Sequence, residues 1–235
     1  VCELWEAEGA KTVRRPGIES SSAENQPDLI DSVSQIGDFE WLVFVSRNAV
    51  RFGIEAIERV FGAVEKAPVG RVAAIGQTTA DLFHSLTGKT VDLVPATADS
   101  ESLGSELADI VETEKVMIFR GNRGSAVLGQ CLSNAQRDFR EIVVYQSQDI
   151  VDPQPEVPLL LQAGKVDWVT ITSGAIAKAT VALFREDLRQ AKLVSLSPKI
   201  TRVLNELGFQ VAAEASSPGM VELVAAVEAY ESNFR

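Results

Sequence analysis

Short apolar runs alternate with longer amphipathic stretches along most of the chain. The runs are rich in β-branched residues and contain few polar positions, which is typical of strands that are buried on both faces of a parallel sheet. The stretches between them repeat apolar residues at helical spacing. The alternation predicts an α/β fold built on doubly wound parallel sheets. The predicted strands cover residues 41–45, 71–75, 89–94, 115–120, 140–145, 167–172, 192–196 and 209–213.

The second half of the chain repeats the order of elements found in the first half. Trp41 and Trp168 each begin an apolar strand, and Ser46 and Ser173 follow them at identical spacing, each before a helical stretch. This recurrence predicts two internally repeated lobes, in each of which a buried strand delivers a serine to the start of a helix.

Two further segments repeat the same order. Residues 71–88 and 192–208 both contain a strand, a small residue, a helix and then a glycine. A glycine at that place is typical of a left-handed cap at the end of a helix. The pairs Ser197-Pro198 and Ser217-Pro218 each place a capping hydroxyl before a proline, which predicts two helix N-termini.

Two extended segments are predicted to connect the lobes. Residues 14–23 and 139–149 flank the first repeat, and we interpret them as a two-stranded linker. If both cross the same junction, residues 24–138 form one lobe, inserted into another lobe made of residues 1–13 and 150–235.

Composition and charge restrict the partners that the protein can have. Hydrophobic residues make up 46% of the 235 residues and charged residues 23%, which is ordinary usage for a folded domain. The formal net charge of −11 argues against a broad nucleic-acid surface, which needs clustered Lys and Arg. The apolar runs are too short to cross a membrane. We expect no nucleic-acid partner and no membrane partner.

The cysteine and histidine content argues against a metal site. Cys2 and Cys131 are the two cysteines and do not form a Cys-x-x-Cys pair, so we expect a reducing compartment and a cytoplasmic location. His84 is the single histidine, and its apolar neighbours indicate an ordinary helix residue.

The predicted strands end in small, hydroxylic or glycine-rich segments. Ligands bind beyond the carboxyl ends of the strands in open parallel sheets, and backbone N–H groups at helix starts can bind carboxylates or phosphates there. Arg47, Arg120 and Arg123 could add charge-assisted contacts. Tyr145 ends an apolar strand in the predicted linker, where its phenol could donate to a ligand or simply pack. The segments are residues 45–48, 75–79, 119–124, 171–175 and 196–199.

These segments, taken in order, resemble the uroporphyrinogen-III synthase family. The resemblance implies two α/β lobes joined by a two-stranded ladder, no cofactor, no metal and a monomer. It also implies a linear tetrapyrrole substrate, hydroxymethylbilane, whose closure with inversion of ring D and loss of water gives uroporphyrinogen III. The matching segments are residues 38–50, 72–83, 98–107, 116–124, 142–147, 166–175, 197–208 and 212–227.

The resemblance also implies roles for individual residues. Tyr145 matches the family's cleft tyrosine, which is proposed to assist departure of the substrate hydroxyl. The residues expected to bind substrate lie at the strand ends and helix starts: Ser46, Arg47, Asn48, Gly76, Thr79, Arg120, Gly121, Thr172, Ser173, Gly174, Ser197, Pro198 and Thr201.

The chain departs from the family pattern in two places. The family usually has Gly-Pro-x-Thr where this chain has residues 197–200, and Thr201 stands one position later. The family usually begins with a strand that ends in Thr-Arg-Pro, so we expect the lobe of residues 1–13 and 150–235 to lack its N-terminal strand.

One other function remains compatible with the sequence, and a second lacks the residues that it needs. A non-catalytic, two-lobed module that binds a tetrapyrrole or regulates another protein could keep this fold, because fold alone does not fix function. A signalling domain like a response regulator would need clustered acidic residues at a strand end, and residues 45–48 and 171–175 contain none.

Overall fold

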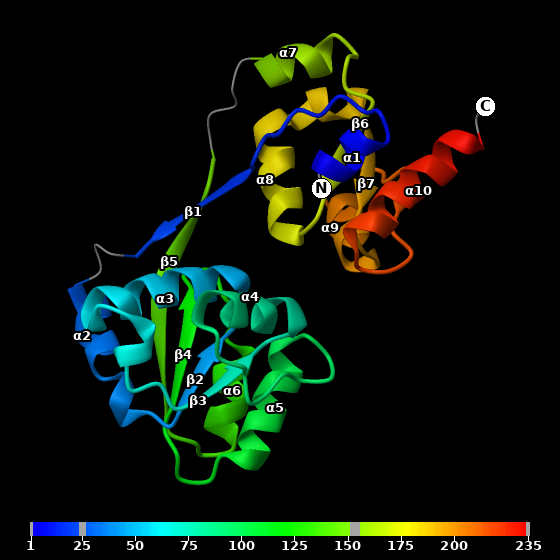
Figure 1. The fold of residues 1–235 in the computed structure, drawn as a ribbon. Helices are drawn as coiled ribbons and strands as arrows, with labels where there is room; N and C mark the ends of the chain where they lie inside the picture. The colour runs from blue at the N-terminus through cyan, green and yellow to red at the C-terminus, as the bar shows by residue number, and fades with distance from the viewer. Residues whose placement is uncertain (1, 24–26, 151–155, 234–235) are drawn as a thin grey trace. The chain divides into compact units, whose positions relative to one another are not determined.

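The computed structural model describes residues 2–23, 27–150 and 156–233. The chain divides into two compact units (Figure 1): unit 1 contains Val1–Glu19 and Gln148–Arg235, and unit 2 contains Ser20–Ser147. The predicted lobe boundary at residue 24 lies outside the described residues.

Unit 2 is built around a five-stranded sheet in the order β1-β5-β4-β2-β3. Strands β2, β3 and β4 and the first part of β5 run parallel. Because the carboxyl ends of parallel strands meet at one edge of a sheet, the loops after β2, β3 and β4 lie together. The strands are β1 (Ile18–Ser22), β2 (Trp41–Phe44), β3 (Arg71–Ala74), β4 (Val116–Gly121) and β5 (Phe139–Asp149).

Helices cover both faces of this sheet (Figure 1). Leu42 and Phe44 of β2 pack against α2, α3 and α4, whereas Trp41 and Val43 pack against α5 and α6. Successive side chains of a strand point to opposite faces, which is why a strand buried on both faces is apolar throughout. The helices are α2 (Pro27–Ser34), α3 (Arg47–Phe61), α4 (Gln77–Thr87), α5 (Ser100–Ile110) and α6 (Val127–Asn134), with 3₁₀ turns at Ile36–Asp38 and Val64–Lys66.

Unit 1 contains a smaller parallel sheet in the order β6-β7-β8. Ile171 and Leu193 pack with α7, α8 and α9, and Val194 packs with α10 and with Trp5 of α1. Its elements are α1 (Cys2–Ala7), α7 (Glu156–Gln162), β6 (Trp168–Ile171), α8 (Gly174–Phe184), β7 (Lys192–Ser195), α9 (Pro198–Glu206), β8 (Ala213–Glu214) and α10 (Met220–Ser232), with a 3₁₀ helix at Arg185–Gln190.

Strands β1 and β5 form a ladder beyond the end of β4. The Ala23 N–H donates to the Val144 carbonyl at 3.1 Å, and the Ile150 N–H donates to the Gly17 carbonyl at 3.0 Å. These two bonds pair the start of one segment with the end of the other, so the strands run in opposite directions. The first residues of β5 pair instead with β4.

Two predicted strands are wrong in length or kind. Residues 89–94 form no strand and meet β3 at an isolated bridge between Ala73 and Leu93. The Asp92 carboxylate accepts from the Val72 N–H at 2.7 Å, and a side chain thereby replaces a ladder carbonyl. The strand predicted at 209–213 is reduced to β8, because the Phe209 N–H still donates to the Leu204 carbonyl of α9 at 2.9 Å.

The helix ends match most of the predicted signals. Gly88 and Gly208 have φ of 69° and 83°, which confirms the left-handed conformation expected after both helices. Ser197 precedes α9 with Pro198 in its first turn, as predicted, although its side chain caps no N–H. The start predicted at Ser217-Pro218 is wrong, since α10 begins at Met220 after Gly219.

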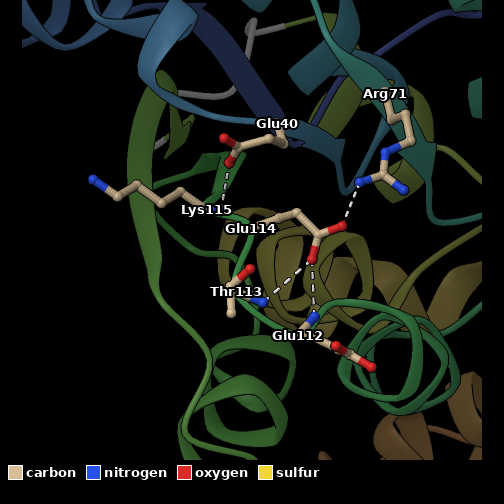
Figure 2. A network of polar contacts seen from close by, with 6 residues as sticks. All are labelled: Glu40, Arg71, Glu112, Thr113, Glu114 and Lys115. Carbon is tan, nitrogen blue, oxygen red and sulfur yellow. Dashed lines mark hydrogen bonds and ion pairs between the residues drawn. The ribbon is translucent and has the colours of Figure 1, made fainter.

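A network of charged side chains lies at the N-terminal ends of the parallel strands of unit 2 (Figure 2). The Glu114 carboxylate lies 2.6 Å from Nη2 of Arg71 and accepts the N–H groups of Glu112 and Thr113 at 2.9 and 3.3 Å. The bond from Arg71, followed by the backbone N–H groups, lowers the pKa of Glu114 to about 2. This network joins the start of β3 to the turn before β4, at the end of the sheet opposite the strand-end loops.

Candidate active site

The predicted site residues of unit 2 gather where β2, β3 and β4 end. Ser46 has extended backbone and caps α3, and its Oγ accepts the Ala49 N–H at 2.9 Å. Gly76 begins α4 in extended backbone and offers no side chain to cap it. Two helix N-termini therefore point toward this edge, where backbone N–H groups favour anions.

An open hollow of about 360 Å³ lies along α4, from Thr78 in its first turn to Ser85, beside Arg47 at the start of α3. The exposed Arg47 lines it together with Thr78, Leu82 and Ser85. Asp81 also lines it, and its carboxylate accepts from Gln77 Nε2 at 2.7 Å. A guanidinium beside a helix start suits a carboxylate ligand. Arg47 is thus the predicted residue that the structure places on a hollow.

Tyr145 is half-buried and contacts the start of α3. Its phenol oxygen shares a hydrogen bond with Ser46 Oγ at 3.2 Å, and its ring stacks on Phe52 with centroids 5.6 Å apart. The backbone of Tyr145 pairs with Gly121 after a register shift between β4 and β5. The structure therefore brings three predicted residues together: Ser46, Gly121 and Tyr145.

A polar cluster that the sequence did not reveal lies beside this group. Asn48, one of the predicted residues, donates to Ser20 Oγ at 3.3 Å, and Ser20 shares a 3.0 Å hydrogen bond with Ser147. The Ser147 N–H donates to Asn122 Oδ1 at 2.9 Å. The only signal in the sequence was that Ser20 and Ser147 stand in the two segments expected to pair.

Arg120 is directed at the turn that follows β4. Its guanidinium forms an ion pair with Glu141 and donates to the Gly121 and Gly124 carbonyls. Its side chain is 13% exposed. These contacts indicate that Arg120 shapes the turn, and a contact with substrate stays a prediction.

The other predicted residues divide between α4 and unit 1. Thr79 is buried in the first turn of α4 and is 3% exposed. Thr172 follows β6, and Ser173 caps α8 by accepting the Ile176 N–H at 3.1 Å. Gly174 is the first residue of α8, where an added Cβ would meet only ordinary contacts.

The end of β7 has a different arrangement. Ser197 is half-buried before α9, and its hydroxyl caps no backbone group, whereas Pro198 is exposed. Thr201 hydrogen-bonds with the buried Ser195 Oγ at 2.6 Å and donates to Glu214. The Thr201 hydroxyl is therefore engaged within unit 1, whereas Ser197 is free of a capping role.

His84 lies exposed in α4, with Nδ1 3.2 Å from the Lys89 carbonyl oxygen, which confirms an ordinary helix residue. Within residues 2–23, 27–150 and 156–233, no helix has the length and apolar character needed to cross a bilayer.

Known proteins resemble this chain over nearly its whole length. The uroporphyrinogen-III synthase of Escherichia coli is 26% identical over 202 residues, which cover 83% of this chain and 81% of that protein. A mutant uroporphyrinogen III synthase from Thermus thermophilus superposes with a TM-score of 0.64 at 15% identity, covering 98% of this chain and 93% of that one. The uroporphyrinogen-III synthetase of Helicobacter pylori gives 0.65 at 18% identity, covering 90% of each chain.

The solved structures share the α/β fold with parallel sheets described above. The sequence profile described as uroporphyrinogen-III synthase HemD matches residues 2–225. That match includes every strand and every predicted site residue. The chain therefore belongs to the uroporphyrinogen-III synthase HemD family.

Proposed function

We propose that this chain closes hydroxymethylbilane to uroporphyrinogen III with inversion of ring D and release of water. The family match over residues 2–225 carries the proposal, and the names of the relatives support it. The reaction places the chain among the lyases of porphyrin and heme biosynthesis. No observation favours the alternative of a non-catalytic binding module.

Tyr145 is the residue best placed to assist the first step. The residue is half-buried, and its phenol has Ser46 Oγ as a hydrogen-bond partner. We propose that the phenol hydrogen-bonds to the substrate hydroxyl while that hydroxyl takes up a proton from solvent and the C–O bond breaks, which releases water and leaves an azafulvene cation. The substituted carbon of ring D then attacks to give a spiro intermediate. That intermediate opens and closes again with ring D inverted, and loss of one proton restores the pyrrole.

The strand-end residues suit the carboxylates of the substrate. In unit 2, Arg47 and the start of α4 border the hollow. We propose that a carboxylate binds there, because a guanidinium and backbone N–H groups both stabilise an anion. The proposed contacts from the rest of the predicted set are Ser46, Asn48, Gly76, Thr79, Arg120, Gly121, Thr172, Ser173, Gly174, Ser197, Pro198 and Thr201.

We also infer that the two units are repeats of one α/β lobe, connected by the strands of residues 14–23 and 139–149. Ser46 and Ser173 support the repeat, because each follows a strand that begins with Trp and each caps a helix through its hydroxyl. The protein is proposed to act as a monomer in the cytoplasm, and light scattering on a sizing column would measure the mass.

Product analysis tests the proposed function. Freshly prepared hydroxymethylbilane closes spontaneously to the type I isomer, so the assay separates the type I and type III uroporphyrinogens with and without the protein. We expect type III to form only with the protein. Tyr145→Phe should slow type III formation about ten-fold, which is less than the ~100-fold or more expected for an obligatory general acid. Type I alone with the protein present would refute the proposal.

A further inference from the structure

Gly121 stands where a side chain would collide with Tyr145. A Cβ built on Gly121 would lie 2.4 Å from Cζ, 2.7 Å from Cε2 and 2.8 Å from the phenol oxygen of Tyr145. Real contacts to a Cβ essentially never fall below 3.0 Å. The Tyr145 ring therefore occupies the space that any residue other than glycine would fill at position 121.

A local irregularity of the sheet creates this contact. Val143 pairs with Arg120, but Gly121 pairs with Tyr145, so Val144 is an extra residue in β5. An extra residue of this kind bends a strand and redirects the side chains that follow it. The bulge thus places the Tyr145 ring over the end of β4.

Other contacts hold the ring in the same place. Phe52 of α3 stacks on it at 5.6 Å, and Ser46 Oγ shares a 3.2 Å hydrogen bond with the phenol. The backbone carbonyl of Tyr145 accepts the Asn122 N–H at 3.2 Å. A ring displaced by a side chain at position 121 would lose the stacking contact with Phe52, the bond to Ser46, or both.

We propose that Gly121 is a positioning residue, which seats the Tyr145 ring so that the phenol reaches the departing hydroxyl of the substrate. This inference rests on the proposed function. It is separate from the substrate contact proposed above for Gly121, because here the residue acts through Tyr145.

A double-mutant cycle tests the proposal. The variants are Gly121→Ala, Tyr145→Phe and the double variant, each assayed for kcat and KM of type III formation. Gly104→Ala is the matched control, because a Cβ there would lie 2.7 Å from Cys131 Cβ, which is also closer than 3.0 Å but between α5 and α6 and away from Tyr145.

We expect Gly121→Ala to lower kcat about ten-fold, as Tyr145→Phe does, with KM changed less than two-fold. The double variant should be no slower than Tyr145→Phe, because both changes remove the same contribution. Gly104→Ala should keep the wild-type kcat. A crystal structure of Gly121→Ala should show the ring displaced from its stack on Phe52.

Three results would overturn the proposal: an unchanged kcat for Gly121→Ala, a double variant whose loss is the product of the two single losses, or an undisplaced Tyr145 ring. Failure of the proposed function looks different, since the wild-type protein would then make no type III isomer at all.

Discussion

The Ser46 hydroxyl makes two contacts, a helix cap and a hydrogen bond to Tyr145, whose contributions to stability can be measured with substitutions. Its Oγ accepts the Ala49 N–H at 2.9 Å and shares a 3.2 Å hydrogen bond with the Tyr145 phenol. Removing a helix cap with alanine costs about 1 kcal/mol, and a neutral hydrogen bond contributes about 1 kcal/mol. Ser46→Ala should therefore lower the free energy of unfolding of unit 2 by about 2 kcal/mol.

Two further variants isolate each contribution. Ser46→Gly should cost about 1 kcal/mol, because glycine is tolerated as a helix cap but cannot bond to the phenol. Ser173→Ala removes the equivalent cap, from Oγ to the Ile176 N–H at 3.1 Å, in unit 1. It should also cost about 1 kcal/mol.

Urea unfolding followed by tryptophan fluorescence measures these differences, with Trp41 reporting on unit 2 and Trp5 and Trp168 on unit 1. Type III formation, measured in parallel, should fall several-fold for both Ser46 variants, because both lose the partner of the phenol. Equal destabilisation by Ser46→Ala and Ser46→Gly would refute the assignment of the cap. Wild-type turnover in both Ser46 variants would refute the role of the hydroxyl in the site.

Three more predictions concern stability. The pKa of the Glu114 carboxyl is lowered from 4.5 to about 2, so the stabilising contribution of its ionised form is present above pH 4.5 and is lost as pH falls toward 2. Glu114→Gln should therefore make the free energy of unfolding depend less on pH over that range. An unchanged pH dependence would contradict this prediction. Gly70→Ala would place a Cβ 2.5 Å from the Glu40 carbonyl oxygen. Urea unfolding should therefore show a free energy of unfolding lower by about 1–3 kcal/mol. Wild-type stability would show instead that the backbone relaxes freely. Thr201→Val leaves the buried Ser195 hydroxyl without its 2.6 Å partner and should lower the free energy of unfolding by about 1–3 kcal/mol. Thr201→Ser keeps a hydroxyl and should lower it less. Equal losses in the two variants would assign the effect to packing.

Much of the sheet architecture could be predicted because buried parallel strands are apolar on both faces. The strands at 41–45 and 192–196 were found in this way, each within one residue of the observed end. The strand predicted at 89–94 failed because periodicity does not reveal that the Asp92 carboxylate takes the Val72 N–H. The strand predicted at 209–213 failed because Phe209 completes the end of α9.

The candidate site was predicted as a set of strand ends, but its internal contacts were not. Ser46 and Tyr145 are far apart in the sequence, and their hydrogen bond depends on the register shift after Arg120. A bulge of one residue leaves no mark in an apolar run. The direction of Arg120 toward Glu141 could not be predicted either, since both side chains are charged and each could equally have faced solvent.

The isomer ratio of the product tests the central claim most directly. Hydroxymethylbilane is mixed with increasing amounts of the protein, and the type III and type I uroporphyrinogens are separated and quantified. We predict that the ratio of type III to type I rises in proportion to the protein added, until type I is no longer detected. A ratio that stays at the value of the protein-free reaction, at every amount of folded protein, would contradict the assignment.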